Sequence, residues 1–201
     1  MQVLRKGMLL VISGPSGTGK GTLAQRLLKE DPSFRFSVSA TTRARRSNET
    51  EGVHYHFISD ERFDQLLAED AFLEHAVVHG HRYGTLRSQV YEAICRGENI
   101  LLDIDPQGAR KVMGKEKDCV TVFILPPSYK ALEVRLHTRN TDDPVEIRRR
   151  LGNARGEIEQ LSRYQYAVVN DELDLAYEQL YSIVTAEKQR TIRFFPTVSE
   201  E

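Results

Sequence analysis

The chain has 201 residues, of which 28% are charged, and its formal net charge is −1. This length suits one domain with a sizeable core, and the balance of charges argues against a general nucleic-acid or membrane-surface binder. The apolar runs are as short as strands and the first residues lack the pattern of a signal peptide, so we expect a soluble, cytoplasmic protein.

A glycine-rich stretch near the N-terminus has the pattern of a phosphate-binding loop. The apolar run over residues 8–12 predicts a buried strand, and leucines at helical spacing predict a helix over residues 19–30. Between them, Gly14, Gly19 and Lys20 fit a frame in which backbone N–H groups surround an anion and the lysine reaches the β- and γ-phosphates of a nucleotide. The predicted nucleotide-binding residues are Gly14, Pro15, Ser16, Gly17, Thr18, Gly19, Lys20, Gly21 and Thr22.

Gly21 departs from the usual frame of this loop. A serine or threonine normally follows the lysine and supplies a hydroxyl to Mg²⁺. We therefore expect a magnesium ion to be held by the nucleotide, by water and by an acid elsewhere in the chain. The hydroxyl of Thr22 is better placed to meet a phosphate.

Residues 37–85 interrupt the alternation of strands and helices and are predicted to form an inserted lobe. A strand over residues 34–39 is predicted to lead into this lobe. Within the lobe we predict strands over residues 53–58 and 72–78, a helix capped by Ser59 or Asp60, and a turn over residues 79–84. The loop over residues 40–52 has almost no hydrophobic residue, so we expect it outside the core. Its Arg43, Arg45 and Arg46 can grip a second phosphate by bidentate hydrogen bonds, and the alternative is a solvated run of charge.

Apolar strands then alternate with amphipathic helices, which predicts an α/β domain with a parallel sheet. The strands are predicted over residues 99–105, 120–125 and 166–170, and the helices over 86–95, 107–112, 129–139, 145–163 and from Asp171 or Asp174 to 190, before a loose tail. Ligands of such sheets bind at the carboxyl ends of the strands, where Asp103 and Asp105 lie. Asp103 has the position of a magnesium-orienting acid, and the alternative is a pair of capping residues.

A set of arginines surrounds a predicted break at residues 140–144, which we interpret as the tip of a movable lid. The set is Arg135, Arg139, Arg148, Arg149, Arg150 and Arg155. The alternative is an exposed surface with Glu133, Glu146 and Glu157 as partners. Cys95 and Cys119 are expected to be reduced packing residues, and the scattered histidines are a weak signal for a metal.

Together these stretches resemble guanylate kinase from about residue 6 to residue 188. The resemblance is carried by residues 14–20 and 37–43, by Gly52 with Tyr55 and Phe57, and by residues 83–85, 102–105, 107–108, 126–128 and 169–171. It implies the three-layer α/β fold of P-loop nucleoside monophosphate kinases. The core would comprise residues 6–36, 86–134 and 164–190, with a GMP-binding lobe over 37–85 and a lid over 135–163 in a single domain, 1–201.

The resemblance also implies transfer of the γ-phosphoryl of ATP to GMP, giving ADP and GDP, with Mg²⁺. By position, the family's ligands of the GMP phosphate are Ser39, Arg43, Arg46, Tyr55 and Tyr83; its guanine readers are Glu74, Thr85 and Asp105; and its lid arginines are Arg135, Arg139 and Arg150, with Asn170 near the adenine. The implied catalytic set is Lys20, Arg43, Arg135, Arg139, Arg150 and Asp103, the last meeting magnesium through water. The expected partners are ATP and GMP, with neither nucleic acid nor membrane, and the oligomeric state is open.

Three positions depart from the family pattern. Arg45 replaces a usual proline, Asn48 a usual glycine, and Thr85 a common serine. Glu74 favours guanine, because one carboxylate accepts hydrogen bonds from both N1–H and N2–H and would face a lone pair on adenine. Two alternatives stay open: a scaffold domain of this family, whose phosphate loops are usually degraded, and a kinase of another small acceptor.

Overall fold

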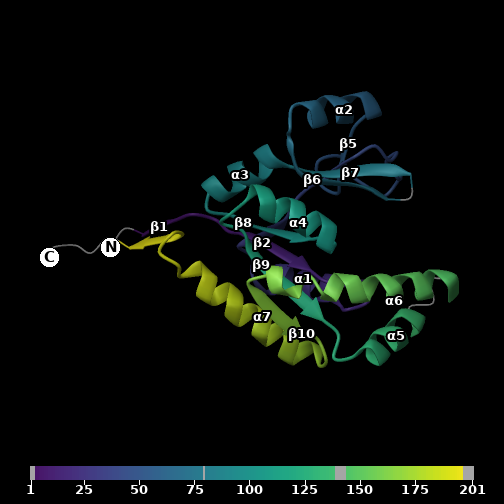
Figure 1. Ribbon diagram of the computed structural model, residues 1–201. Coiled ribbons are helices and arrows are strands. Elements are labelled where there is room, and N and C mark those ends of the chain that lie inside the picture. The colour runs from purple at the N-terminus through teal and green to yellow at the C-terminus, as the bar shows by residue number, and fades with distance from the viewer. Residues whose placement is uncertain (1–2, 79, 139–143, 197–201) are drawn as a thin grey trace.

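A parallel five-stranded sheet forms the centre of the molecule. The computed structural model describes residues 3–78, 80–138 and 144–196 (Figure 1). The strand order is β10-β9-β2-β8-β3, and all four pairings are parallel. The strands are β2 (Leu9–Ser13), β3 (Phe34–Phe36), β8 (Asn99–Asp103), β9 (Val120–Leu125) and β10 (Tyr166–Val169). The predicted parallel sheet is confirmed.

Helices cover both faces of this sheet (Figure 1): α1 (Lys20–Glu30), α3 (Arg87–Cys95), α4 (Pro106–Lys115) and α7 (Leu173–Lys188). Leu10 and Ile12 of β2 share a buried cluster with residues of α1 and α7. Leu9 and Val11 share a second cluster with residues of α3 and α4. Because alternate residues of a strand face opposite sides, one apolar run holds two helical layers to the sheet. The three-layer α/β fold is confirmed.

A second, four-stranded sheet and a helix form a small lobe beside the core. The lobe consists of β4 (Ala40–Thr41), β5 (His56–Phe57), α2 (Asp60–Ala68), β6 (Phe72–Val78) and β7 (His81–Leu86). Its own buried cluster contains Phe63 and Phe72, whose rings stack at 4.6 Å. Ser59 caps α2 by accepting a hydrogen bond from the backbone N–H of Arg62 at 3.2 Å, as predicted.

Two expectations about this lobe are wrong. Residues 81–86 form strand β7 and do not belong to a turn, and Gly84 lies within this strand, where an added Cβ would come within 2.6 Å of the Phe72 ring. The loop over residues 40–52 is not wholly outside the core, since Ala40 and Thr41 are fully buried in β4. Strand β4 lies between β5 and β7, and this burial comes from pairing with residues distant in sequence.

Helices α5 (Tyr129–Thr138) and α6 (Pro144–Ile158) pack together, followed by a short 3₁₀ helix (Leu161–Arg163). Leu132 and Leu136 of α5 form a buried cluster with Ile147 and Ala154 of α6. Of the predicted lid tip at residues 140–144, only Pro144 is among the described residues, where it begins α6, and Arg139 also lies outside them. Within the described ranges, no helix is both long and apolar enough to cross a membrane.

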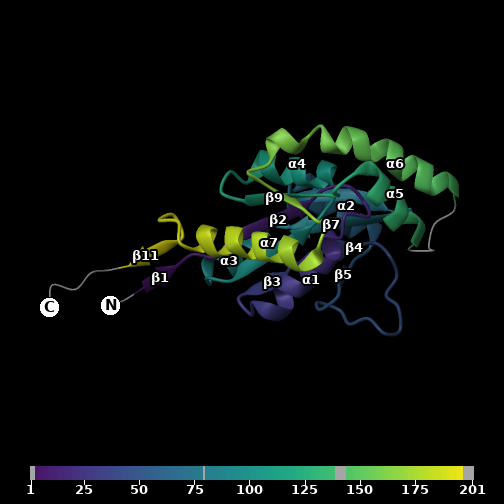
Figure 2. The ribbon, with the colours of Figure 1, turned by 90° about the horizontal axis from the view of Figure 1, so that it is seen from below.

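The two ends of the chain pair with each other. Strand β1 (Val3–Arg5) is antiparallel to β11 (Phe194–Pro196), and this ribbon projects from the helical body (Figure 2). The expected loose tail is therefore wrong up to Pro196. Just before β11, buried Arg193 donates to Glu187 Oε2 and to the Asp118 carbonyl, both at 2.7 Å. These bonds anchor the base of the ribbon to the core.

The start of the last helix also differs from expectation. Neither Asp171 nor Asp174 caps α7; the cap position belongs to Glu172, whose side chain makes no capping bond. Asp174 instead lies in the first turn and binds Arg26 of α1 at 2.5 Å. An acidic residue in the first turn of a helix interacts favourably with the helix dipole without acting as the cap.

Candidate active site

The predicted phosphate-binding loop lies between β2 and α1 and requires glycine at several positions. Gly14, Gly17 and Gly19 have φ values of 137°, 91° and 89°. A Cβ on Gly14 would lie 2.3 Å from the Ile124 carbonyl oxygen, and one on Gly19 would lie 2.3 Å from Asn170 Nδ2. The loop therefore combines left-handed backbone with close approach of its neighbours, which only glycine allows.

Lys20 begins α1 and folds back over the loop. Its Nζ donates to the carbonyl oxygens of Gly14 at 2.6 Å and Pro15 at 2.8 Å. Thr18 also bonds within the loop, since its buried hydroxyl donates to the Pro15 carbonyl at 2.9 Å. These bonds hold the loop in shape and keep the ammonium group of Lys20 at its mouth.

Asp103 ends β8 directly beside this loop. A Cβ on Gly21 would lie 3.4 Å from Asp103 Oδ2. Burial raises the pKa of Asp103, and the positive charge of Lys20 opposes that rise. An acid is thus placed near the residue that normally carries the magnesium-binding hydroxyl. Among the described residues, no three His, Cys, Asp or Glu side chains are grouped as metal ligands.

The helical pair α5–α6 reaches the loop through arginines. Arg150 Nη1 donates to Ser16 Oγ at 3.2 Å. Arg135 donates to the carbonyl oxygens of Asn170 at 2.7 Å and Asp171 at 3.2 Å. Buried Asn170 in turn donates from Nδ2 to the Thr18 carbonyl at 2.8 Å. In this structure Asn170 therefore braces the loop and Arg135 binds the segment after β10.

Two cavities meet at Asp103 and Ile104. One, of about 550 Å³, is lined by Lys20, Asp105, Arg149, Arg150 and Glu157, and the strand residue Val77 reaches it from the lobe. The other, of about 610 Å³, lies between lobe and core and is lined by Ser39, Tyr55 and Thr85. Each cavity is within the size range of ligand sites, about 300–1,000 Å³. The two therefore form adjacent sites at the carboxyl ends of the strands.

The three predicted guanine readers, Glu74, Thr85 and Asp105, lie close together. The hydroxyl of Thr85 donates to Glu74 Oε1 at 2.6 Å, and both side chains are buried. A Cβ on Gly108 would lie 3.3 Å from Asp105 Oδ1 and 3.4 Å from Glu74 Oε2. Asp105 also caps α4 by accepting from the Gly108 N–H at 2.7 Å. Burial is the main cause of a raised pKa at Glu74, with its bond to Thr85 acting against it.

Glu49 orders the arginine loop, the segment over residues 40–52 that carries Arg43, Arg45 and Arg46. The sequence analysis did not identify this role of Glu49. Arg43 donates from Nη1 and Nη2 to the two oxygens of Glu49, at 3.0 and 2.6 Å. The backbone N–H of Arg46 donates to the same carboxylate at 2.8 Å. Arg43 holds the pKa of Glu49 at about 2, chiefly by hydrogen bonding. The spacing of six residues was available in the sequence, but nothing local indicated which acid would pair.

Aromatic rings connect this arginine to the cavity between lobe and core. Arg43 lies 5.5 Å from the centre of the Tyr55 ring, and the Tyr55 and Tyr83 rings meet edge to face at 5.8 Å. The side chain of Arg46 is exposed. The structure thus brings Arg43 and Tyr83 against Tyr55, which together with Ser39 lines the cavity between lobe and core.

Two described arginines of the predicted lid set, Arg148 and Arg155, line neither of these two cavities. Arg148 is exposed, and the guanidinium of Arg155 lies 5.6 Å from the centre of the Tyr129 ring. Sequence reasoning gave no functional role to Asn153 and took Glu157 only as a partner for surface arginines, yet both line the cavity that contains Lys20. The signal that would have found them is the spacing of 150, 153 and 157, which lie on one face of a helix.

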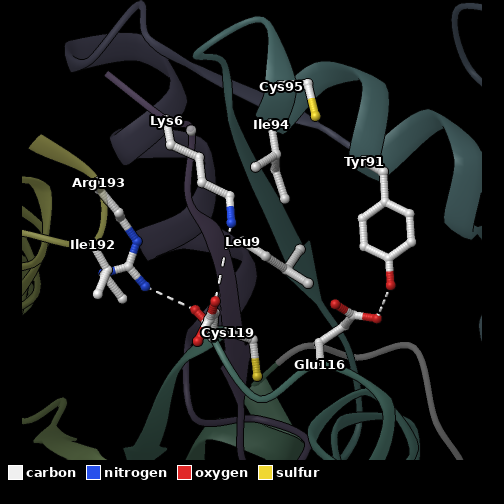
Figure 3. Close-up of a pocket in the computed structure, with 11 residues that line it drawn as sticks. Lys6, Leu9, Tyr91, Ile94, Cys95, Glu116, Cys119, Ile192 and Arg193 are labelled. Carbon is white, nitrogen blue, oxygen red and sulfur yellow. Dashed lines mark hydrogen bonds and ion pairs between the residues drawn. The ribbon is translucent and has the colours of Figure 1, made fainter. Parts of the chain in front are cut away.

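A smaller cavity, of about 190 Å³, lies where the core meets the base of the terminal ribbon (Figure 3). Both cysteines line it, together with Leu9, Ile94 and a Tyr91 side chain that donates to Glu116. Cys119 is buried, which raises its pKa to about 11, whereas Cys95 is exposed, so the prediction of packing holds only for Cys119. The cavity is below the size of most ligand sites, about 300–1,000 Å³.

Adjacent cavities joined at one carboxylate suit a reaction between two phosphorylated ligands, and the fold around them is that of the P-loop nucleoside monophosphate kinases. The sequence model of the guanylate kinase family matches residues 6–187. The chain belongs to the guanylate kinase family.

Individual relatives agree with this assignment. The guanylate kinase of Rhizobium etli is 47% identical over 194 residues, which cover 96% of this chain and 88% of that protein. The guanylate kinase of Syntrophotalea carbinolica is 49% identical over 189 residues, covering 94% and 90%. The crystal structure of guanylate kinase from Anaplasma phagocytophilum matches with a TM-score of 0.71 and 34% identity, covering 94% of this chain and 90% of that one.

Proposed function

We propose that this chain transfers the γ-phosphoryl group of ATP to GMP, giving ADP and GDP, at the junction of the two cavities. The observation that carries this proposal is the position of Asp103 and Ile104, which line both the cavity of the phosphate loop and the cavity of the lobe. Phosphoryl transfer needs little covalent chemistry from a protein and depends on aligning two phosphates and neutralising charge. The proposed cellular site is the cytoplasm.

On the donor side, the loop and the helical pair α5–α6 hold the triphosphate. The backbone N–H groups of the loop and Lys20 bind its β- and γ-phosphates, while Arg150 approaches from α6, where it now meets Ser16. Arg135 keeps α5 against the segment after β10. We assign residues 135–163 the role of a lid whose arginines neutralise the moving phosphoryl group, with Arg139 included by resemblance alone.

On the acceptor side, residues 37–85 hold GMP. The phosphate of GMP is bound by Arg43, Arg46, Tyr55, Tyr83 and Ser39. The carboxylate of Glu74, already accepting from Thr85, accepts the N1–H and N2–H of guanine, and Asp105 lies beside it. No covalent intermediate on the protein is needed, because the phosphate oxygen of GMP attacks the γ-phosphorus directly.

The residues present suit a magnesium ion carried by the nucleotide. Asp103 offers a carboxylate oxygen 3.4 Å from the place of a Cβ on Gly21, and Mg²⁺ prefers oxygen ligands and keeps several waters. Bound there, the ion would neutralise charge on the β- and γ-phosphates. Asp103 is proposed to contact it through water.

A panel of acceptors tests the proposed function. We expect ATP-dependent formation of ADP with GMP and at least about 10³-fold lower kcat/KM with AMP, because a buried carboxylate rejects a base that lacks the matching donors. CMP and dTMP serve as further acceptors in the same coupled assay. Equal rates with AMP or CMP would favour a kinase of another acceptor. ATP binding without transfer to any of the four would favour the non-catalytic scaffold alternative.

Substituting Glu49 tests the order of the arginine loop. We expect Glu49→Gln to raise the KM for GMP by about three- to tenfold, because charge-assisted hydrogen bonds to Arg43 and Arg46 are lost from a partly exposed site. The KM for ATP and the kcat at saturating GMP should stay near wild-type values. Because the pKa of Glu49 is about 2, the effect should not vary between pH 6 and pH 9 in steady-state assays. An unchanged KM for GMP would contradict this role.

A further inference from the structure

Three acidic side chains, those of Asp103, Asp105 and Glu157, line the cavity of about 550 Å³ that also contains Lys20 and Arg150. Of the three, Glu157 alone has no part in the proposed function. It is partly buried, and its carboxylate makes neither a hydrogen bond nor an ion pair with the part of the chain that the structure describes. Burying a carboxylate costs free energy, so an unbonded one in this place calls for a physical role.

Helix α6 places the Glu157 carboxylate on the same face as Arg150. Residues 150, 153 and 157 follow helical spacing, and all three line the cavity. Arg150 reaches Ser16 of the phosphate loop. Burial raises the pKa of Glu157; the charge of Lys20 opposes this and that of Asp105 adds to it. One helix face therefore carries a positive group to the loop and a negative group to the space between Lys20 and Asp105.

Two simpler roles do not fit. A surface ion pair is excluded because Glu157 makes none with the described residues. A ready-made metal centre is excluded for the same part of the chain, because no three His, Cys, Asp or Glu side chains are grouped there as ligands. What remains is the field of the carboxylate, which attracts Lys20 and repels the phosphates of a nucleotide.

We propose that Glu157 is a positioning residue. Its negative charge faces Lys20 and competes with the phosphates of a nucleotide for the ammonium group of Lys20. Its charge weakens the binding of ATP and ADP and so hastens the departure of ADP after transfer. The inference rests on the proposed function for its place in turnover, but its effect on nucleotide binding does not require GMP.

Glu157→Gln provides the test, because it keeps the shape and removes the charge. By titration calorimetry with ADP and with a non-hydrolysable ATP analogue, each with Mg²⁺, we expect the Kd to fall by about three- to tenfold at low salt. This gain in affinity should be smaller in about 0.5 M salt, where charges are screened over a few ångströms. The KM for ATP should fall with it, and kcat should fall or stay level, whereas a merely structural role would not tighten binding.

Two further variants frame the outcome. Glu157→Asp should bind ADP like the wild type, and Glu159→Gln, which removes an exposed acid two residues further along, should also leave the Kd unchanged. An unchanged or increased Kd for Glu157→Gln overturns the inference, and an increase would identify Glu157 as a direct ligand of the nucleotide or its metal. Tighter ADP binding in a protein that fails to phosphorylate GMP would leave this inference standing and reject the proposed function.

Discussion

Replacing Lys20 with methionine is expected to leave a folded protein whose kcat is lower by about 10²–10³-fold or more, because one preorganised positive donor is lost at the point where charge develops. Methionine keeps most of the length of the side chain, so the packing of the loop against Asn170 and Ile124 should survive. The two bonds that Lys20 donates to loop carbonyls are lost, but the Pro15 carbonyl keeps the bond from the Thr18 hydroxyl, and Gly14 lines the cavity that contains Lys20.

The measurements are turnover in a coupled assay with ATP and GMP and the thermal midpoint by circular dichroism. Lys29→Met is the matched control, because Lys29 is an exposed lysine in the last turn of the same helix. That variant should turn over like the wild type. Near-normal turnover of Lys20→Met with an intact fold would contradict the assignment of the phosphate loop.

Replacing Glu74 with glutamine is expected to lower kcat/KM for GMP by about 10³–10⁴-fold, because the variant offers an N–H₂ group where guanine needs a second acceptor. The KM for ATP should change little, since Glu74 lies in the lobe, on β6. Glu69→Gln is the control, because Glu69 is an exposed acid at the end of α2 in the same lobe. Retained discrimination between GMP and AMP in Glu74→Gln would reject Glu74 as the guanine reader.

The pH dependence of the same site gives a further readout of Glu74. Burial raises its pKa, so the carboxylate is protonated at a higher pH than an ordinary glutamate, about 4.3. The KM for GMP should therefore rise as the pH falls towards that raised value, and Glu74→Gln should lose this dependence. Because the folded protein binds this proton more tightly than the unfolded chain, the contribution of Glu74 to stability increases as the pH falls. Protonation of Glu74 therefore does not favour unfolding, and weaker GMP binding at acid pH is not explained by loss of the fold through this residue.

Sequence reasoning succeeded where the signal is local or where a long run of residues shares one pattern. The apolar run before Gly14 and the glycines around Lys20 defined strand, loop and helix together, because each part constrains a few neighbouring φ and ψ angles. Strands β6 and β9 were predicted at their observed bounds for the same reason. The order of buried strands and helices was enough to predict a parallel sheet with ligands at its carboxyl edge.

The misplaced elements depended on partners far away in sequence. Residues 79–84 carry glycines and polar side chains, which predicted a turn, but residues 81–84 belong to β7, which pairs with the adjacent β6 on one side and with the distant β4 on the other. The terminal residues lack an apolar pattern, and only the meeting of β1 with β11 orders them. The pairings of β7 with β4 and of β1 with β11 join segments tens of residues or more apart, so no short window along the chain contains both partners.

By itself, the sequence determined the glycine-rich loop with its flanking strand and helix and the parallel α/β core, because these follow from backbone geometry and hydrophobic periodicity within short segments. It also supplied the residue types that are proposed to bind two nucleotides. Only the tertiary structure decided that Asn170 braces the loop, that Glu49 orders Arg43 and that Glu157 enters the cavity of Lys20. Those relations are set by the packing of helices and sheets that bring distant side chains within a few ångströms, and a charge acts on the groups nearest in space, whatever their separation along the chain.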